Sequence, residues 1–473
     1  MTKAPGNVVT LSAFELSGAI YQRELSCREV MQAFLARIDE VNPVFNAIVA
    51  LQAHDQLIAQ ADERDRQLTQ GQYLGWMHGI PQAIKDLSPA KGIVMTSGSL
   101  NMANVRSAAD GLIAERIRKA GAIIIGKTNT PEFGLGSQTY NAVYGVTRNA
   151  FDPSKCAGGS SGGAAVALAT HMLPVADGSD MGGSLRNPAA FNNVYGFRPS
   201  RGLVPQWPSQ DLFYQQLGTE GPMARNVRDL TRLLATLAGY DKRAPLSLAG
   251  DGKRFESLKC RDDWRGTKVG WLGNWNDHLP FEDGILDLCE QGLKELGSLG
   301  CDVRPASIGF PPEEIWRSFM KLRQCLVSGK LIDLYRDPSK RALMKPEAIW
   351  EVESGLQATA LDVYQASVVR SSWYAHVCGQ FEQFDFLVTP TAQVFPFDAL
   401  THWPKSIAGR QMDTYHRWME VVVPWTMAGL PVLNVPVGFG VNGLPMGMQL
   451  IGAPQADARV LQLGDAYDRA RTS

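Results

Sequence analysis

The sequence is poor in the features that mark secreted, metal-binding and membrane proteins. Its 473 residues include seven cysteines, an odd number, with no C-x-x-C pair, which excludes zinc ribbons and thioredoxin-like redox pairs. We expect free, mostly buried thiols in a reducing compartment. The longest apolar stretches, such as residues 164–169, are far too short to span a bilayer, so no membrane partner is expected.

An excess of charge of one sign and a targeting segment are also lacking. The formal net charge is −1, so nothing indicates a direct, charge-driven nucleic-acid ligand. Residues 1–18 contain no basic segment followed by an apolar one, so no signal peptide is expected and a cytoplasmic location is predicted. The seven histidines show no metal-ligand spacing, and we expect neither a metal nor any other cofactor.

Helical and strand-like segments alternate along the chain. Two capping boxes, Ser12-x-x-Glu15 and Ser26-x-x-Glu29, start helices, and Pro43 is expected to follow the end of the second helix. Further helices are expected at residues 52–70, 112–120, 162–171 and 226–239 and along 310–380. Strands are expected at residues 79–86, 122–125, 173–176, 268–272, 386–388, 433–437 and 446–451.

This alternation predicts an α/β fold with helices on both faces of a sheet. No repeat, low-complexity tract or linker interrupts the chain. We therefore expect one domain over residues 1–473, with a variable helical insertion around residues 310–380. The oligomeric state is left open, and a homo-oligomer is one of the alternatives.

The most informative feature is a pair of glycine-flanked serine clusters. The first reads GGSSGG and runs directly into the alanine-rich residues 164–169, which favour a helix. Ser160 and Ser161 are thus predicted to lie at a helix N-terminus, where free N–H groups and the dipole favour negative charge.

The second cluster reads GSDMGGS and follows a predicted strand. It places Ser184 after Met181-Gly182-Gly183, a turn that can aim successive backbone N–H groups at one point, as an oxyanion hole requires. A hydroxyl nucleophile at neutral pH also needs a base.

Lys85 is the candidate for that base. His171 lies mid-way along an apolar run, and Cys156 has no histidine near it and is interpreted as structural. Lys85 ends the apolar run 80–84, and burial can lower a lysine pKa by up to about 3–5 units. Alternation sends Asp86 to the opposite face. From the strand alone, a solvated surface lysine is the competing interpretation.

One further motif, Gly121–Thr128, matches the phosphate-loop pattern G-x-x-x-x-G-K-[ST]. Its variable residues are Ala-Ile-Ile-Ile, which favour a strand, and no helical run follows. Nucleotide binding is therefore not expected.

Lys85 and the two serine clusters, in this order, resemble the amidase signature family. The resemblance extends over most of the chain, through the segments Gly79–Pro81, Thr96–Ser99, Gly126–Asn129, Glu132–Phe133, Arg148–Asn149, Gly178–Ala190, Gly221–Ala224, Ala428–Pro431, Val435–Pro436 and Gly443–Leu450. It implies a large mixed β-sheet core with helices on both faces and acyl transfer by a Ser–cis-Ser–Lys triad.

The resemblance also assigns roles to single residues. Ser184 is the nucleophile, Ser160 the bridging serine in a cis peptide, and Lys85 the base. The oxyanion hole is assigned to the backbone N–H groups of Met181, Gly182, Gly183 and Ser184. Supporting roles fall to Ser161, Asp180 and Arg186.

Three positions depart from the family pattern. Ser179 and Met181 stand where threonine is common, and Ala157 replaces a common proline. None of these changes removes a catalytic atom. The resemblance therefore predicts hydrolysis of a small carboxylic amide to an acid and ammonia or an amine.

Two alternatives remain. One is the glutaminase subunit of a tRNA-dependent amidotransferase, which uses the same triad and docks partner chains. The other is a non-catalytic scaffold with the same fold. Substrate choice is expected to lie in residues 200–215 and 310–425. Six aromatic residues there either line a pocket or belong to the core: Trp207, Phe213, Tyr214, Trp316, Trp350 and Trp418.

Overall fold

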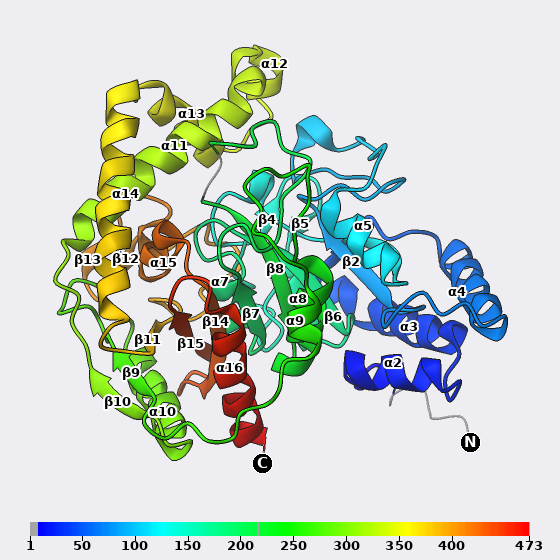
Figure 1. Ribbon diagram of the computed structural model, residues 1–473. Helices are drawn as coiled ribbons and strands as arrows, with labels where there is room; N and C mark the ends of the chain where they lie inside the picture. The colour runs from blue at the N-terminus through cyan, green and yellow to red at the C-terminus, as the bar shows by residue number, and fades with distance from the viewer. Residues whose placement is uncertain (1–7, 215–216, 473) are drawn as a thin grey trace.

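The computed structural model describes residues 8–214 and 217–472, which are organised around an eight-stranded and a three-stranded β-sheet (Figure 1). The strands are β1 (Ile48–Val49), β2 (Pro81–Lys85), β3 (Ile123–Thr128), β4 (Tyr140–Asn141), β5 (Gly145–Val146), β6 (Val175–Asp180), β7 (Tyr195–Arg198), β8 (Thr219–Ala224), β9 (Lys268–Trp271), β10 (Asp302–Pro305), β11 (Phe386–Pro390), β12 (Ser406–Ile407), β13 (Arg410–Gln411), β14 (Val432–Phe439) and β15 (Pro445–Gly452).

The α-helices surround these sheets. They are α2 (Ala13–Tyr21), α3 (Cys27–Phe45), α4 (His54–Thr69), α5 (Leu112–Lys119), α6 (Gly162–Ala169), α7 (Arg186–Phe191), α8 (Val227–Leu237), α9 (Lys253–Glu256), α10 (Ile285–Ser298), α11 (Pro312–Arg336), α12 (Pro338–Arg341), α13 (Pro346–Leu356), α14 (Ala360–Gln380), α15 (Val423–Ala428) and α16 (Asp457–Thr472). Short 3₁₀ turns lie at Leu100–Met102, Glu132–Gly134 and Arg417–Val422. Within the described residues, no helix is both long and apolar enough to cross a membrane.

The large sheet is mixed. Its strands follow the order β10-β9-β11-β15-β14-β7-β8-β6. The pairs β10–β9 and β9–β11 are parallel, and the remaining neighbours are antiparallel. The predicted α/β fold with a large mixed sheet is confirmed.

Helices cover both faces of this sheet. Leu433 of β14 lies on one face, and a Cβ on Gly464 of α16 would stand only 2.2 Å from its side chain. The neighbouring residue of β14, Asn434, pairs with Gly196 of β7 and so faces the other side. A Cβ on Gly196 would lie 2.9 Å from Ala189 of α7. Glycine at positions 196 and 464 therefore lets α7 and α16 approach opposite faces closely.

The small sheet, in the order β1-β3-β2, ends beside β6. There the backbone N–H of Lys85 donates to the side-chain oxygen Oδ2 of Asp177 at 3.2 Å, instead of joining a β-ladder. The small sheet was not expected from the sequence. This sheet is important for the site because it places Lys85, the last residue of β2, beside β6.

Residues 310–380 form helices, as predicted. The long helices α11 and α14 pack together, with α13 against α11, at one side of the molecule (Figure 1). Trp373 of α14 anchors this group, because its ring N–H donates to the carbonyl of Pro424 in α15 at 2.8 Å.

Other predictions for secondary structure were confirmed or need correction. Both capping boxes are present, at Ser12 and Ser26. The prediction that Pro43 follows its helix was wrong: α3 continues to Phe45 and ends at Asn46, whose φ is +51°. A proline in the last turn removes one backbone hydrogen bond, which the remaining helix tolerates.

The strand expected at residues 173–176 starts later and runs through Asp180. Part of the second serine cluster therefore belongs to a strand and not to a turn. Residues 123–128 of the phosphate-loop look-alike are strand β3, in agreement with the physical interpretation of that motif.

Candidate active site

Lys85 ends β2 and is buried, with 1% of its surface exposed. Its amine Nζ donates to the hydroxyls of Ser160 and Ser161, each at 2.8 Å. It also contacts Ser179, with 3.1 Å to the hydroxyl and 3.3 Å to the carbonyl oxygen. Burial lowers the pKa of Lys85 to about 7, against the opposing effect of nearby carboxylates, Asp177 first. A substantial fraction of the amine is therefore neutral at physiological pH.

The two hydroxyl partners of Lys85 come from the turn that precedes α6. The peptide bond Gly159–Ser160 is cis, as the resemblance implies. Ser161 is the N-cap residue of α6 and makes no side-chain capping bond, which leaves its hydroxyl for the amine. The hydroxyls of Ser137 and Thr139 hold this turn by donating to the carbonyls of Gly159 and Gly158, at 2.6 and 2.8 Å.

Ser184 lies on the turn between β6 and α7. Its backbone carbonyl accepts from the N–H of Ser161 at 3.2 Å, so the two serine clusters are directly joined. The Oγ of Ser184 has no hydrogen-bond partner among the described residues, and Ser184 lines the same cavity as Ser160. The structure thus brings Lys85, Ser160 and Ser184 to one site, without a hydrogen bond between the two serine hydroxyls.

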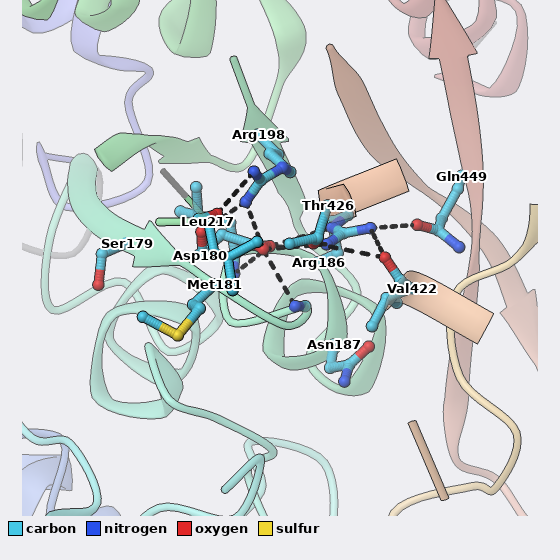
Figure 2. Close-up of polar contacts among 12 residues, drawn as sticks. Ser179, Asp180, Met181, Arg186, Asn187, Arg198, Leu217, Val422, Thr426 and Gln449 are labelled. Atoms are coloured by element: carbon cyan, nitrogen blue, oxygen red, sulfur yellow. Dashed lines mark hydrogen bonds and ion pairs between the residues drawn. The ribbon is translucent and has the colours of Figure 1, made fainter. Parts of the chain in front are cut away.

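Asp180 braces the turn that follows β6 and joins it to Arg186 and Arg198 (Figure 2). Its carboxylate accepts the backbone N–H of Gly183 at 3.0 Å and of Leu185 at 3.1 Å. It also forms ion pairs with the guanidinium groups of Arg186, at 2.9 Å, and Arg198, at 3.0 Å. Burial alone would raise the pKa of Asp180, but the two arginines outweigh it and hold the pKa well below its usual range.

Arg186 connects this brace to β15, a strand in the middle of the large sheet, and to the segment 422–426. It donates to the carbonyl of Val422 at 2.9 Å, to Thr426 Oγ1 at 2.9 Å and to Gln449 Oε1 at 2.7 Å (Figure 2). The position of the turn is therefore tied to η3, the 3₁₀ turn Arg417–Val422, and to α15 and β15.

The backbone N–H groups of this turn differ in availability. Those of Met181, Gly182 and Ser184 make no hydrogen bond within the described part of the chain. The N–H of Gly183 is occupied by Asp180, and its φ of +94° favours glycine. Three N–H groups therefore remain beside the Ser184 hydroxyl.

These groups border a cavity of about 490 Å³. One part of its lining comes from the two serine clusters, with Ser160, Ser179, Met181, Gly182 and Ser184. Other parts come from the segments 87–89, 111–113, 133–136 and 206–210 and from α11. Its size suits a small organic molecule.

Known proteins resemble the chain over nearly its full length. A family model described as Amidase matches residues 29–461. The chain belongs to the amidase signature family. An acylamidase of Rhodococcus erythropolis is 32% identical over 471 residues, covering 98% of this chain and 96% of the relative. This amidase is accordingly an enzyme that hydrolyses carboxylic amides.

Further relatives include both acylamidases and components of amidotransferases. The crystal structure of a bacterial aryl acylamidase superposes with a TM-score of 0.91 at 29% identity, covering 97% of the amidase chain and 96% of that structure. A glutamyl-tRNA(Gln) amidotransferase subunit of Cyanothece sp. is 31% identical over 483 residues, covering 96% of the amidase chain and 97% of the relative.

The aromatic residues of the two substrate-choice segments divide between cavity, core and surface. In the amidase cavity only Trp207 among the six is part of the lining. Trp316 and Trp418 are buried in the core, and Phe213 and Tyr214 are exposed. Cys156 is buried, and burial raises the pKa of its thiol to about 12, consistent with a structural role.

Several residues of the site were not identified from the sequence. Arg198 and Glu220 reach it through the pairing of β7 and β8, and Arg323 through the packing of α11. Arg323 forms a buried ion pair with Glu351 at 2.7 Å. A single charged residue in a strand or helix carries no local signal of such distant partners.

One group of side chains within the described residues has the composition of a metal site. His278, Glu313 and Glu420 offer ligand atoms within 4.8 Å of one another. However, the guanidinium of Arg417 forms ion pairs with both carboxylates and already supplies their positive counter-charge. We assign no metal to this group.

Proposed function

We propose that Ser184, Ser160 and Lys85 are the nucleophile, the bridging serine and the base of this amide hydrolase. The observation that carries the proposal is the 2.8 Å contact between the buried Lys85 amine, whose pKa is about 7, and the Ser160 hydroxyl. A neutral amine can accept a proton, whereas an ordinary solvated lysine is charged at neutral pH.

The reaction begins with proton transfer. Lys85 accepts the proton of Ser160, which takes the proton of Ser184 as the Ser184 oxygen attacks the amide carbonyl carbon. The Ser184 hydroxyl, which has no hydrogen-bond partner among the described residues, must first approach the Ser160 hydroxyl. Catalytic hydrogen bonds commonly tighten in this way when substrate binds.

The tetrahedral intermediate places negative charge on the former carbonyl oxygen. We propose that the N–H groups of Met181, Gly182 and Ser184 donate to it. Gly183, also expected to donate, instead shapes the turn through its bond to Asp180. Asp180 and Arg186 keep this turn in place, and Ser161 holds the Lys85 amine.

Collapse of the intermediate completes the first half of the reaction. The C–N bond breaks, and the proton held on Lys85 returns through Ser160 to the leaving nitrogen. Water then attacks the Ser184 ester by the same proton path and releases the acid. These steps balance with the three side chains and water, without a cofactor.

The principal test is Ser184→Ala. We expect loss of amide hydrolysis by roughly 10⁴-fold or more, because removing the nucleophile disables the unit. Labelling with a fluorophosphonate probe, followed by mass spectrometry, should modify Ser184 in the wild type and nothing in the variant. The control is Ser209→Ala, since Ser209 also lines the cavity. Probe labelling that persists in Ser184→Ala would remove this residue from the mechanism and indicate a different nucleophile.

The glutaminase component of an amidotransferase stays the second candidate, because the chain is almost equally identical to an acylamidase and to such a component. A stand-alone enzyme should hydrolyse simple amides with the purified chain. Glutamine cleavage that appears only with the partner chains of an amidotransferase would favour the alternative.

The proposal also covers the domain organisation, the location and the partner of the enzyme. We propose that the chain acts as one domain, with residues 310–380 as a variable segment that shapes substrate choice, since α11 contributes to the cavity. All seven cysteines are free thiols, which supports a cytoplasmic location. The partner is a small amide, with or without self-association of the enzyme.

A further inference from the structure

Glu220 is an ionisable side chain of the cavity that the proposed proton path does not use. It lies in β8 directly opposite Ser179 of β6. Residues opposite each other in an antiparallel ladder point to the same face. The Glu220 carboxyl therefore lies on the side of the sheet where Lys85 donates to the Ser179 hydroxyl, and it lines the cavity together with Ser184.

Within the described residues, only one of the two oxygens of this carboxyl group accepts a hydrogen bond. Oε1 accepts the hydroxyl of Ser88 at 2.7 Å, whereas Oε2 has no donor within the described residues. No described lysine, arginine or histidine forms an ion pair with Glu220. In contrast, the buried carboxylates of Asp180 and Glu351 each have arginine partners. A carboxylate removed from bulk water without a counter-ion is costly.

The charged groups around Glu220 are engaged elsewhere. Lys85 of β2 donates to serine hydroxyls, and Arg116 of α5 donates to the backbone carbonyls of Leu237 and Gly239. Asp177 of β6 adds a second negative charge. Burial raises the pKa of Glu220 to about 7, supported by Asp177 and opposed by the Ser88 hydrogen bond, Lys85 and Arg116.

The part of the cavity next to Ser88 is apolar. Pro89 follows Ser88 in the chain and is linked through its carbonyl to the N–H of Gly111 at 2.9 Å. Leu112 is in turn linked to the carbonyl of Trp207 at 2.9 Å. Pro89, Leu112 and Trp207 all line the cavity, so a hydrocarbon chain can pack beside the carboxyl group.

Basic side chains line the cavity from α11. Arg323 and Lys330 line the cavity from that helix, Arg323 already paired with Glu351. The cavity is thus acidic on the β8 side and basic on the α11 side. Such a field orients a polar substrate.

We propose that Glu220 and Ser88 form a subsite for a protonated amine, so that the enzyme favours amides bearing an ammonium group on a short apolar chain. The inference rests on the proposed function, because the subsite belongs to the same cavity. The ammonium donates to Oε2 and supplies the missing counter-charge, while Ser88 keeps the carboxyl in place.

The test compares ligands that differ only in this charge. The first measurement is calorimetric binding of n-pentylammonium and of 1-pentanol to the wild-type enzyme at pH 8. We expect the ammonium to bind about tenfold more tightly or better, as for a charge-assisted hydrogen bond. Glu220→Gln should remove that difference, and Ser88→Ala should reduce it. Glu290→Gln, which removes a carboxylate from the exposed side of α10, should retain it.

The second measurement uses substrates. The ratio of kcat/KM for 5-aminopentanoyl anilide over pentanoyl anilide should exceed one and fall about tenfold in Glu220→Gln. In the wild type this ratio should rise between pH 6 and pH 8, because Glu220 becomes ionised above its pKa of about 7. In Glu220→Gln it should be independent of pH over the same range.

The outcomes separate the subsite from the proposed reaction. Equal binding of the two ligands by the wild type, or a preference that survives Glu220→Gln, would overturn the subsite. A parallel loss of both anilide activities with an unchanged ratio would do the same. Tight ammonium binding that depends on Glu220, without cleavage of either anilide, would support the subsite and count against the proposed function.

Discussion

Two groups of side chains near the end of β6 contain buried basic residues, and the two groups differ in the partners that surround the basic side chain. The Lys85 amine lies against hydroxyls, so desolvation dominates and brings its pKa to about 7. Arg186 and Arg198 instead share the carboxylate of Asp180, so that one negative charge faces two guanidinium groups. A buried lysine can release its proton, whereas an arginine effectively cannot. The same sheet edge therefore holds a group suited to accept protons next to a brace made of ion pairs.

We expect the largest effect when a guanidinium replaces the amine at position 85. In Lys85→Arg the base would be permanently charged, and we expect kcat/KM to fall by roughly 10³-fold or more. Steady-state rates on an amide that the wild type cleaves, with circular dichroism to verify folding, provide the measurement. Lys119→Arg, on the exposed side of α5, is the matched control. Wild-type rates in Lys85→Arg would exclude the lysine as base.

The second prediction breaks the brace. Asp180→Asn leaves two buried guanidinium groups without a carboxylate, and we expect a loss of unfolding free energy of about 3–5 kcal/mol. Denaturant titration measures the loss. The control is Asp263→Asn, an exposed partner of Arg265, for which no measurable change is expected. Equal stabilities of the two variants would show that the brace does not stabilise the fold.

We expect the smallest effect from a change of pH alone, without any substitution. Because burial lowers the pKa of Lys85 to about 7, the amine is protonated below this pH and neutral above it. We expect kcat/KM to rise about tenfold per pH unit below pH 7 and to level off above it. An acidic limb near pH 10, the range of an unperturbed lysine, would contradict a buried base.

The sequence predicted the parts of the fold that have local signals. The capping boxes at Ser12 and Ser26 are fixed by side chains three residues apart, and they were found. In the large sheet, strands β7, β8 and β10 were missed. Residues 219–224, TEGPMA, lack the alternation and β-branched residues of an ordinary strand, and they become one by pairing with β6 and β7.

The candidate site shows the same limit. Glycine, serine and the residues that follow them predicted two turns locally, and the structure brings Ser160 and Ser184 to one cavity. Arg198 and Glu220 could not be predicted, because their roles arise from which strands become neighbours. Trp207 could not be distinguished from the five other aromatics, since side-chain exposure to a cavity depends on the packing of several segments.

The origin of the cavity walls has an evolutionary consequence. The proposed catalytic side chains lie between residues 85 and 184, whereas α11 contributes a separate wall from residues 312–336. This wall is not independent of the turn, because the guanidinium of Arg323 in α11 contacts the sulfur of Met181 at 3.3 Å. Selection for a new substrate through this helix must therefore preserve its contact with Met181.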